Sequence, residues 1–227
     1  MTLQKLLTRL ILFCVCPLIL LSIFLAAYSV LSKQDERNIE ASSLAKNVAV
    51  AIDQYLQARV SALHMLAESS LVDDPAKWKD FYREAQGFQQ GFGSHVILAD
   101  PQMRMLVNTR APFGAPLPFL PPSKGRAAAP TALKTGKPAV GDIVFGPVAR
   151  EPLVAIAVPS LREGKVANLL LTTMATRQFQ ARLDQVSLPS GWALSLLDGN
   201  ATAIARRVPP GFNAQTDVDK AGRFVVK

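Results

Sequence analysis

The sequence contains few of the side chains that enzyme and metal sites most often use. Among its 227 residues are two cysteines, Cys14 and Cys16, and two histidines, His64 and His95. Both cysteines lie in an apolar stretch near the N-terminus, so the rest of the chain has no thiol for a nucleophile, a thiolate metal site or a disulfide. Neither histidine belongs to a metal or nucleophile motif, and no glycine-rich phosphate loop occurs. We therefore expect no cofactor and no catalytic site. A Ser-His-Asp triad is recognised by its geometry, so residue spacing alone does not exclude one.

Clustered positive charge is also missing. The formal net charge is +8, but the basic residues are scattered along the sequence and form no stripe. Nucleic-acid binding requires a basic face interleaved with aromatic residues, so no nucleic-acid partner is expected. The charge supports at most a mild attraction to anionic ligands or lipid head groups.

Charge is absent from residues 10–31, a stretch of 22 residues that are almost all apolar. At about 1.5 Å per residue a helix of this length extends roughly 33 Å, which matches a bilayer core of about 30 Å. The rival interpretation is a cleaved signal peptide, whose apolar region usually has about 7 to 15 residues. Its best cleavage site here, residues 25–27, is imperfect. We predict a transmembrane helix over 10–31, with residues 1–9 as a cytoplasmic tail because that tail is purely basic.

The segment after the apolar stretch predicts a long helix. Residues 32–70 contain neither proline nor glycine, and apolar residues such as Val48, Ile52 and Leu56 recur at helical spacing. We predict a helical stalk over residues 32–72. The alternative is a simple coiled coil, but the apolar stripe is wider than a two-in-seven seam and predicts packing along a domain as well. Helical stalks of this type usually pair, so a homodimer is expected.

The pattern of residues 73–187 predicts a small α+β domain. Apolar runs bounded by turn residues predict five strands, and helical spacing predicts helices before, between and after them. The predicted strands are 96–99, 104–109, 139–145, 153–158 and 166–174, and the predicted helices are 76–88, 127–133 and 175–185. Five antiparallel strands with helices across one face form a PAS-like sheet.

One hairpin pattern occurs twice. In residues 95–110 and again in 192–207, an apolar run reaches an aspartate, turns and continues to a basic residue. Aligning Asp100 with Asp198 brings the apolar positions of both segments into register. We therefore predict the start of a second PAS-like domain over residues 188–227. Only a linker and one strand, 222–226, follow the second hairpin, so this sheet would be incomplete and the chain looks truncated.

Three segments resemble a known family. They are RAPFGAPLP (110–118), TGKPAVGDIVFGPVAREPLVAIAVP (135–159) and LPSGWALSLLDGNATAIAR (188–206). They resemble the double Cache sensor domains of proteobacterial histidine kinases and diguanylate cyclases. The resemblance implies a bacterial inner-membrane receptor with most of this chain in the periplasm. It also implies a ligand-binding domain far from the membrane (73–187) and a second domain near it (188–227).

One subfamily of these sensors binds amino acids through tyrosine, arginine and tryptophan residues after the long helix and an aspartate on the last strand of the distal sheet. Trp78, Tyr82 and Arg83 are of suitable types, but their order differs, and the predicted last strand, 166–174, has no acid. An α-ammonium group would lack its counter-charge there. Amino-acid binding is therefore not expected.

The expected pocket lies between the sheet and the helix and loop that cover it. Its candidate residues are Trp78, Tyr82, Arg83, Arg110, Phe113, Asp142 and Phe145. Arg110 would present a planar fork to a carboxylate, so the expected ligand is a small organic anion. In the alternative interpretation Arg110 pairs with Asp142 or faces solvent, and the aromatic residues belong to the core.

Together these features predict the extracytoplasmic sensing region of a membrane-anchored signalling receptor, in first place a histidine kinase. Ligand binding would move the long helix between two states. The alternatives are the sensor of a diguanylate cyclase or chemoreceptor, and a membrane-anchored periplasmic adaptor without a ligand. A second apolar segment and an enzyme domain encoded after Lys227 would favour a receptor, and a stop codon there would favour the adaptor.

Overall fold

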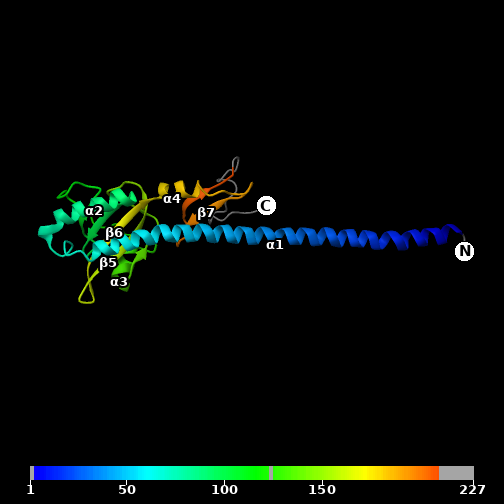
Figure 1. The fold of residues 1–227 in the computed structure, drawn as a ribbon, viewed down its shortest axis with the longest axis horizontal. Coiled ribbons are helices and arrows are strands. Elements are labelled where there is room, and N and C mark those ends of the chain that lie inside the picture. Colours follow the sequence, from blue (N-terminus) through cyan, green and yellow to red (C-terminus); the bar gives the residue numbers. More distant parts are fainter. Residues whose placement is uncertain (1–2, 123–124, 210–227) are drawn as a thin grey trace. The chain divides into compact units, whose positions relative to one another are not determined.

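The computed structural model describes residues 3–122 and 125–209, and within residues 3–35 it describes the side chains of positions 15, 18–25 and 28. The chain divides into two compact units, residues 1–51 and 52–227. All described strands lie in the second unit (Figure 1). The predicted tail and much of the predicted span therefore lie outside the described side chains. Within the described part of the chain, no helix has a stretch long and apolar enough to cross a membrane.

Six strands form one antiparallel sheet whose long central pair is β5 and β6. The strands are β1 (His95–Ala99), β2 (Met105–Asn108), β3 (Ala139–Val140), β4 (Val144–Phe145), β5 (Pro152–Arg162) and β6 (Lys165–Ala175). Their order is β2-β1-β6-β5-β3, and β4 pairs with β5 beside β3. The predicted α+β class and the PAS-like antiparallel sheet are thereby confirmed.

The predicted strand 139–145 is wrong, because residues 141–143 leave the sheet between β3 and β4. The Asp142 amide donates to the Arg126 carbonyl oxygen at 2.8 Å, which draws this segment toward the chain before α3 (Ala128–Thr135). A side chain at Gly141 would place its Cβ 2.8 Å from the Ala128 nitrogen. The glycine therefore permits an approach that the alternation of apolar residues could not reveal.

Helices cover both faces of the sheet, not one face as the sequence pattern predicts. Side chains that alternate along a strand point to opposite faces. On β1, Ile97 and Ala99 pack with the alanines of α3. The buried Val96 and Leu98 therefore face the other side.

That other side is covered by helices from the N-terminal part of the domain and by α4 (Thr176–Leu183). A short 3-10 turn, η1 (Pro75–Lys77), leads into α2 (Trp78–Phe92), which contacts β1 and β2. Helix α2 extends beyond its predicted end at residue 88 and is capped by Gly93, which has a φ of +65°. Helix α4 contacts β5 and β6.

Helix α1 (Leu3–Ala67) includes most of the predicted stalk but ends at Ala67, before residue 72. The reason is a cap supplied by β5. Ser160 Oγ and Arg162 Nη2 donate to the Ala67 carbonyl oxygen at 2.9 and 3.1 Å. A cation at a helix C-terminus is favoured by the helix dipole, and Arg162 also pairs with Asp73 at 2.8 Å. The aspartates after α1 thus belong to this cap and to the start of η1, which Asp74 caps.

Tyr55 on α1 lies between two guanidinium groups. The Cζ atoms of Arg59 and Arg182 each lie 3.7 Å from its ring centre, within the range of cation–π attraction. Arg59 is 5% exposed, and its Nη1 and Nη2 atoms donate to the carbonyl oxygens of Tyr55 and Phe92 at 3.0 and 2.7 Å. Burial lowers the pKa of Arg59. These contacts attach α1 to α4 and to the end of α2.

The repeated hairpin is confirmed down to its hydrogen bonds. Asp100 Oδ1 accepts a hydrogen bond from the Arg104 amide at 2.8 Å. At the equivalent place Asp198 Oδ1 accepts one from the Thr202 amide, also at 2.8 Å. Both turns also place the third residue after the aspartate at positive φ, Met103 at 65° and Ala201 at 61°.

The second hairpin consists of β7 (Leu194–Leu197) and β8 (Ala203–Arg207) and forms a separate two-stranded sheet. Its open end is attached to α4. The side-chain amide of Gln180 donates to the Arg206 carbonyl oxygen at 2.9 Å and accepts from the Arg206 amide at 3.0 Å. The predicted last strand, 222–226, lies outside the described residues.

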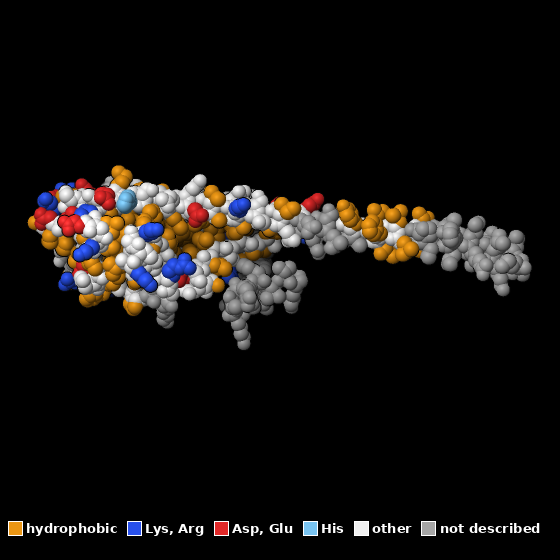
Figure 2. All heavy atoms as spheres, turned by 90° about the horizontal axis from the view of Figure 1, so that it is seen from below, with side chains coloured by type: hydrophobic (Ala, Val, Ile, Leu, Met, Phe, Trp, Pro, Cys, Tyr) orange, Lys and Arg blue, Asp and Glu red, His pale blue; other side chains and the backbone are white. Residues whose placement is uncertain are grey.

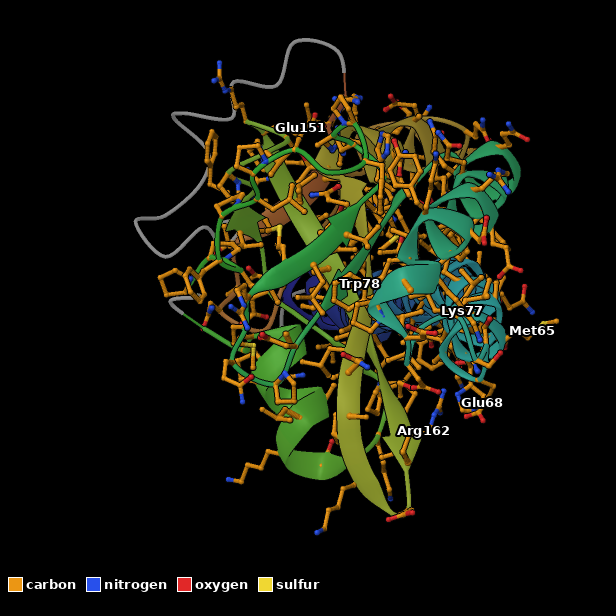
Figure 3. All side chains as sticks on the ribbon, turned by 90° about the vertical axis from the view of Figure 1, so that its left-hand side faces the viewer. Met65, Glu68, Lys77, Trp78, Glu151 and Arg162 are labelled. Atoms are coloured by element: carbon orange, nitrogen blue, oxygen red, sulfur yellow. The ribbon has the colours of Figure 1, made fainter. Side chains whose placement is uncertain are left out.

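Two neighbouring positions on α1 test the packing of this helix on the sheet domain. Leu63 is fully buried, whereas Met65 is 77% exposed. Figure 3 shows Met65 at the outer edge of the molecule. We expect Leu63→Ala to lower the free energy of unfolding by about 2–5 kcal/mol, because it leaves a cavity. Met65→Ala should change it by less than about 0.5 kcal/mol. Urea unfolding followed by circular dichroism measures both values, and equal effects would contradict the packing described here.

Candidate ligand-binding cavity

The α3 face of the sheet contains a cavity of about 280 Å³. Strands β1, β2, β5 and β6 form its floor, and the residues before and within α3 together with the loop around β4 form its cover. The lining residues are Ile97, Met103, Met105, Asn108, Arg110, Leu120, Pro121, Pro122, Ala127, Ala128, Ala129, Pro130, Gly141, Asp142, Val144, Gly146, Pro147, Val148, Ala149, Leu153, Ala155, Leu171 and Thr173. Most of these side chains are apolar, as is usual for small-molecule sites. Polar groups enter at Asn108, Arg110, Asp142 and Thr173.

Small side chains create this space. Ala128 and Ala129 of α3 and Ala155 of β5 face the cavity, and larger residues at these positions would fill it. Prolines 121 and 122 keep the covering segment out of the sheet, because a proline has no N–H group for strand pairing. The alanine and proline content of these segments is visible in the sequence, but it does not reveal which side chains meet.

Two of the seven predicted site residues, Arg110 and Asp142, line the cavity. Trp78, Tyr82 and Arg83 lie on α2, and α3 covers the face with the cavity. The Trp78 ring N–H donates to the Val72 carbonyl oxygen at 3.1 Å, and Arg83 pairs with Asp80 at 3.0 Å on the surface. Figure 3 shows Trp78 at the start of α2, well away from Glu151.

The predicted aromatic residues outside α2 do not line the cavity either. Phe145 on β4 is 62% exposed and Phe113 is 44% exposed. Phe113 packs against Tyr82 with 5.7 Å between ring centres, and the Tyr82 hydroxyl donates to the Ala111 carbonyl oxygen at 3.0 Å. The aromatic residues thus fasten the segment after β2 to α2.

Arg110 pairs with Glu151, a residue that the sequence pattern did not single out. An oxygen of Glu151 lies 3.5 Å from Arg110 Nη1, and its other oxygen contacts Arg177 of α4. The alternative pairing of Arg110 with Asp142 is therefore wrong. Burial lowers the pKa of Arg110, and the positive charge of Arg177 adds to this effect while Glu151 opposes it. Glu151 lies directly before β5, and no pattern in the sequence links it to β2.

His95 lies beside this ion-pair group. Its Nδ1 atom is 3.2 Å from the Thr109 hydroxyl, which accepts a hydrogen bond from the Val96 amide at 3.0 Å. Burial lowers the pKa of His95, and Arg110 lowers it further, whereas Thr109 and Glu151 act in the opposite direction. We therefore expect a neutral imidazole at pH 7.

Asp142 is 6% exposed and is held by three donors. Its Oδ2 atom accepts from the Arg126 amide at 2.5 Å and from Asn200 Nδ2 at 3.0 Å, and its Oδ1 atom accepts from the Gly199 amide at 2.8 Å. This carboxylate therefore connects the cavity to the turn of the β7–β8 hairpin. Among the described residues no group of three or more His, Cys, Asp or Glu side chains is arranged to hold a metal ion.

Solved structures of bacterial receptor domains have a similar fold. The ligand-binding domain of the Campylobacter jejuni chemoreceptor Tlp3, in complex with 4-methylisoleucine, matches with a TM-score of 0.58 and 13% identity over 75% of this chain and 71% of that chain. The ligand-binding domain of the Pseudomonas fluorescens chemoreceptor CtaA, in complex with L-serine, matches with a TM-score of 0.56 and 15% identity over 73% of this chain and 69% of that chain. The sensor domain of the Vibrio cholerae histidine kinase DctB matches with a TM-score of 0.55 and 11% identity over 74% of this chain and 65% of that chain.

The chain has the fold of bacterial ligand-binding sensor domains. The predicted resemblance to Cache sensor domains is thereby confirmed at the level of the fold. No protein-family model and no curated protein matches this chain.

The pKa of His95 reports on the charges at this end of the cavity. Arg110→Ala removes a neighbouring positive charge, so we expect the pKa of His95 to rise toward its ordinary value. Glu151→Gln removes a negative charge and should lower this pKa further. A pH titration of the imidazole C–H signals by NMR measures both shifts. Arg110→Lys keeps the charge and is the matched control; equal titration midpoints in all four proteins would contradict the described arrangement.

Proposed function

We propose that this chain is the extracytoplasmic ligand-sensing region of a membrane-anchored bacterial signalling receptor. We further propose that its cavity binds a small organic anion through Arg110. The observation that carries this proposal is a single guanidinium group at the end of an otherwise mostly apolar cavity of about 280 Å³. A cavity of this size suits a molecule of few heavy atoms, and a planar fork of N–H donors suits a carboxylate.

The charge balance around Arg110 supports an anionic ligand. Arg110 and Arg177 share one carboxylate, that of Glu151, so one positive charge has no direct counterpart in this group. Arg110 has a side chain that is 23% exposed, and its charge is more weakly solvated than that of a surface arginine. A ligand carboxylate would restore part of the lost solvation and complete the charge balance.

Amino acids form a second ligand class to test. The two chemoreceptor domains above are in complex with 4-methylisoleucine and L-serine. In this chain β6 has no acidic side chain. The acid that lines the cavity is Asp142, and its oxygens already accept three hydrogen bonds. An ammonium group would have to compete with those donors, so a carboxylate without an amino group is the better fit.

The membrane anchor is supported by the N-terminal part of α1. Large apolar side chains there are exposed, from Val15 at 44% to Tyr28 at 65%, and Figure 2 shows them gathered along this helix. Together with the uncharged sequence of residues 10–31, this supports a helix in the inner membrane with the sheet domain in the periplasm. Residues 32–72 would then form the stalk.

The receptor class and the domain division remain part of the proposal. A histidine kinase is proposed first and is supported by the likeness to the DctB sensor, with a diguanylate cyclase or a chemoreceptor as alternatives. Residues 73–187 would form the membrane-distal domain, and residues 188–227 would begin the proximal one. Exposed apolar residues on α1, such as Ile39 at 71% and Val50 at 51%, support pairing with a second copy.

Thermal-shift screening of the full chain with small carboxylates tests the ligand proposal. A ligand at 100 times its dissociation constant should stabilise the protein by about 2.7 kcal/mol, which is measurable as a rise in Tm. We expect Arg110→Ala to abolish this rise and Arg110→Lys to weaken it, because lysine keeps the charge but loses the fork. Arg83→Ala, which removes an arginine outside the cavity, should leave it unchanged.

Three outcomes would overturn the proposed ligand. Equal Tm shifts in Arg110→Ala and in the unsubstituted protein would show that carboxylates bind elsewhere. No shift with any carboxylate, combined with a shift for neutral compounds, would show that the cavity binds another class of ligand. A complete lack of ligands would favour the adaptor without a ligand.

A further inference from the structure

Among the described residues, Asp142 is the charged residue that both lines the cavity and contacts the second hairpin. Its Oδ2 atom accepts hydrogen bonds from two places, the Arg126 amide before α3 and the side-chain amide of Asn200 in the β7–β8 turn. Its Oδ1 atom accepts from the Gly199 amide in the same turn. The cover of the cavity and the hairpin turn thus share one buried carboxylate.

A second carboxylate, that of Asp198 in the hairpin turn, contacts the segment around Asp142. Asp198 Oδ2 accepts from the Ile143 amide, next to Asp142, at 3.2 Å. Burial alone would raise the pKa of Asp198, but hydrogen bonds from Thr202, Ile143 and Asn200 outweigh it and lower this pKa. In the first hairpin the equivalent oxygen, Asp100 Oδ2, pairs with Arg104 of its own turn at 3.0 Å. The second copy of the turn therefore uses this oxygen to reach another element.

The segments around Asp142 are in close contact. A Cβ atom at Gly125 would lie 1.9 Å from Asn200 Nδ2 and 2.4 Å from Asp142 Oδ2, and a Cβ atom at Gly199 would lie 2.8 Å from Asp142 Oδ1. No side chain fits at either position without moving the carboxylate or the turn. A small displacement of the cavity cover therefore cannot be absorbed by free space here.

We propose that Asp142 is the positioning residue that transmits occupancy of the cavity to the β7–β8 hairpin. Residues 127–130 cover the cavity and directly follow Arg126, whose amide shares Asp142 Oδ2 with Asn200. A ligand that moves this cover changes the position of the Arg126 amide relative to Asp142 Oδ2. The hydrogen bond between the same oxygen and Asn200 in the turn then changes as well. The inference rests on the proposed function in one respect only, that the cavity is occupied by a ligand.

The other end of the hairpin determines what such a change does. Its open end is held by α4 through Gln180, and Arg207 Nη1 donates to the Asp184 carbonyl oxygen at 2.8 Å at the end of that helix. With this end attached and the turn released, the hairpin tilts about α4. Transmission through Asp142 is therefore a change in orientation of the hairpin and not its unfolding.

Hydrogen exchange of the full chain can test this without knowledge of the ligand. In a background with Cys14→Ser and Cys16→Ser, Ala155→Cys places a thiol in the cavity. Two methanethiosulfonate reagents, one leaving a methyl group and one leaving a sulfonatoethyl group, then fill the cavity to different extents. We expect the sulfonatoethyl adduct to change amide exchange in residues 194–207 at least threefold, and the methyl adduct to change it less. In Asp142→Asn, which is isosteric but presents an amide to the three donors, exchange of this segment should be at least tenfold faster and should no longer respond to the adduct.

Controls separate coupling from loss of structure. Asp80→Asn alters an exposed carboxylate on α2 and should leave both the hairpin exchange and its response unchanged. Asn200→Ala removes one of the three donors and should give an intermediate exchange rate, so it replaces Asp142→Asn if that variant fails to fold. The proposal is overturned if the adduct changes exchange around the cavity but not in the hairpin, or if Asp142→Asn leaves the response intact. Because the adduct does not depend on recognition by Arg110, a hairpin response without any carboxylate-induced Tm shift would overturn the proposed ligand and support this coupling.

Discussion

The antiparallel pairing of β5 with β6 is the constraint on which the rest of the domain depends. The two strands are 11 residues long and pair from Leu153 with Ala175 to Arg162 with Lys165. Both faces of this pair are buried, one under α3 and one under α4 and the N-terminal helices. Its hairpin end caps α1, and the half of the pair farther from the hairpin contributes Ala155 and Thr173 to the cavity floor. A shift of this register would therefore disturb the helix and the cavity together.

Much of the fold could be predicted from the sequence because local chemistry determines it. Five apolar runs located the strands, although the third was predicted too long. The Asp100 and Asp198 turns were recognised as copies because the same pattern of an apolar run, an aspartate and a basic residue occurs twice. The absence of proline and glycine predicted a long helix. Arg110 was found as a cavity residue because it follows an apolar strand at the point where the chain enters a proline-rich loop.

What could not be predicted depends on contacts between residues far apart in the sequence. Tertiary packing decides which face of the sheet α2 covers, and the sequence does not reveal that face. The aromatic residues of α2 were therefore assigned to the pocket, although α3 covers the face that contains the cavity. Glu151 became the partner of Arg110 only because β5 brings it there. The Asp142 carboxylate accepts a hydrogen bond from the Gly199 amide, which lies 57 positions away in the sequence. No local sequence pattern predicts such a pair. The break between β3 and β4 at Gly141 arises from the close approach of this backbone to that of Ala128. The pattern of apolar residues carries no information about such an approach.

The contacts of α1 change in kind along the helix from Ala67 toward Tyr55. At Ala67 the helix is fixed by directional hydrogen bonds from β5. Around Tyr55 guanidinium and ring contacts, which tolerate lateral displacement better than hydrogen bonds do, act together with the hydrogen bond from Arg59 to the Phe92 carbonyl oxygen. The Ala67 cap is therefore the point about which a tilt of this helix would turn. Twelve residues separate the two points, so a tilt of about 3° at the pivot displaces Tyr55 by about 1 Å at a rise of about 1.5 Å per residue. An angular change too small to disturb the core thus becomes a displacement that grows in proportion to the distance from Ala67.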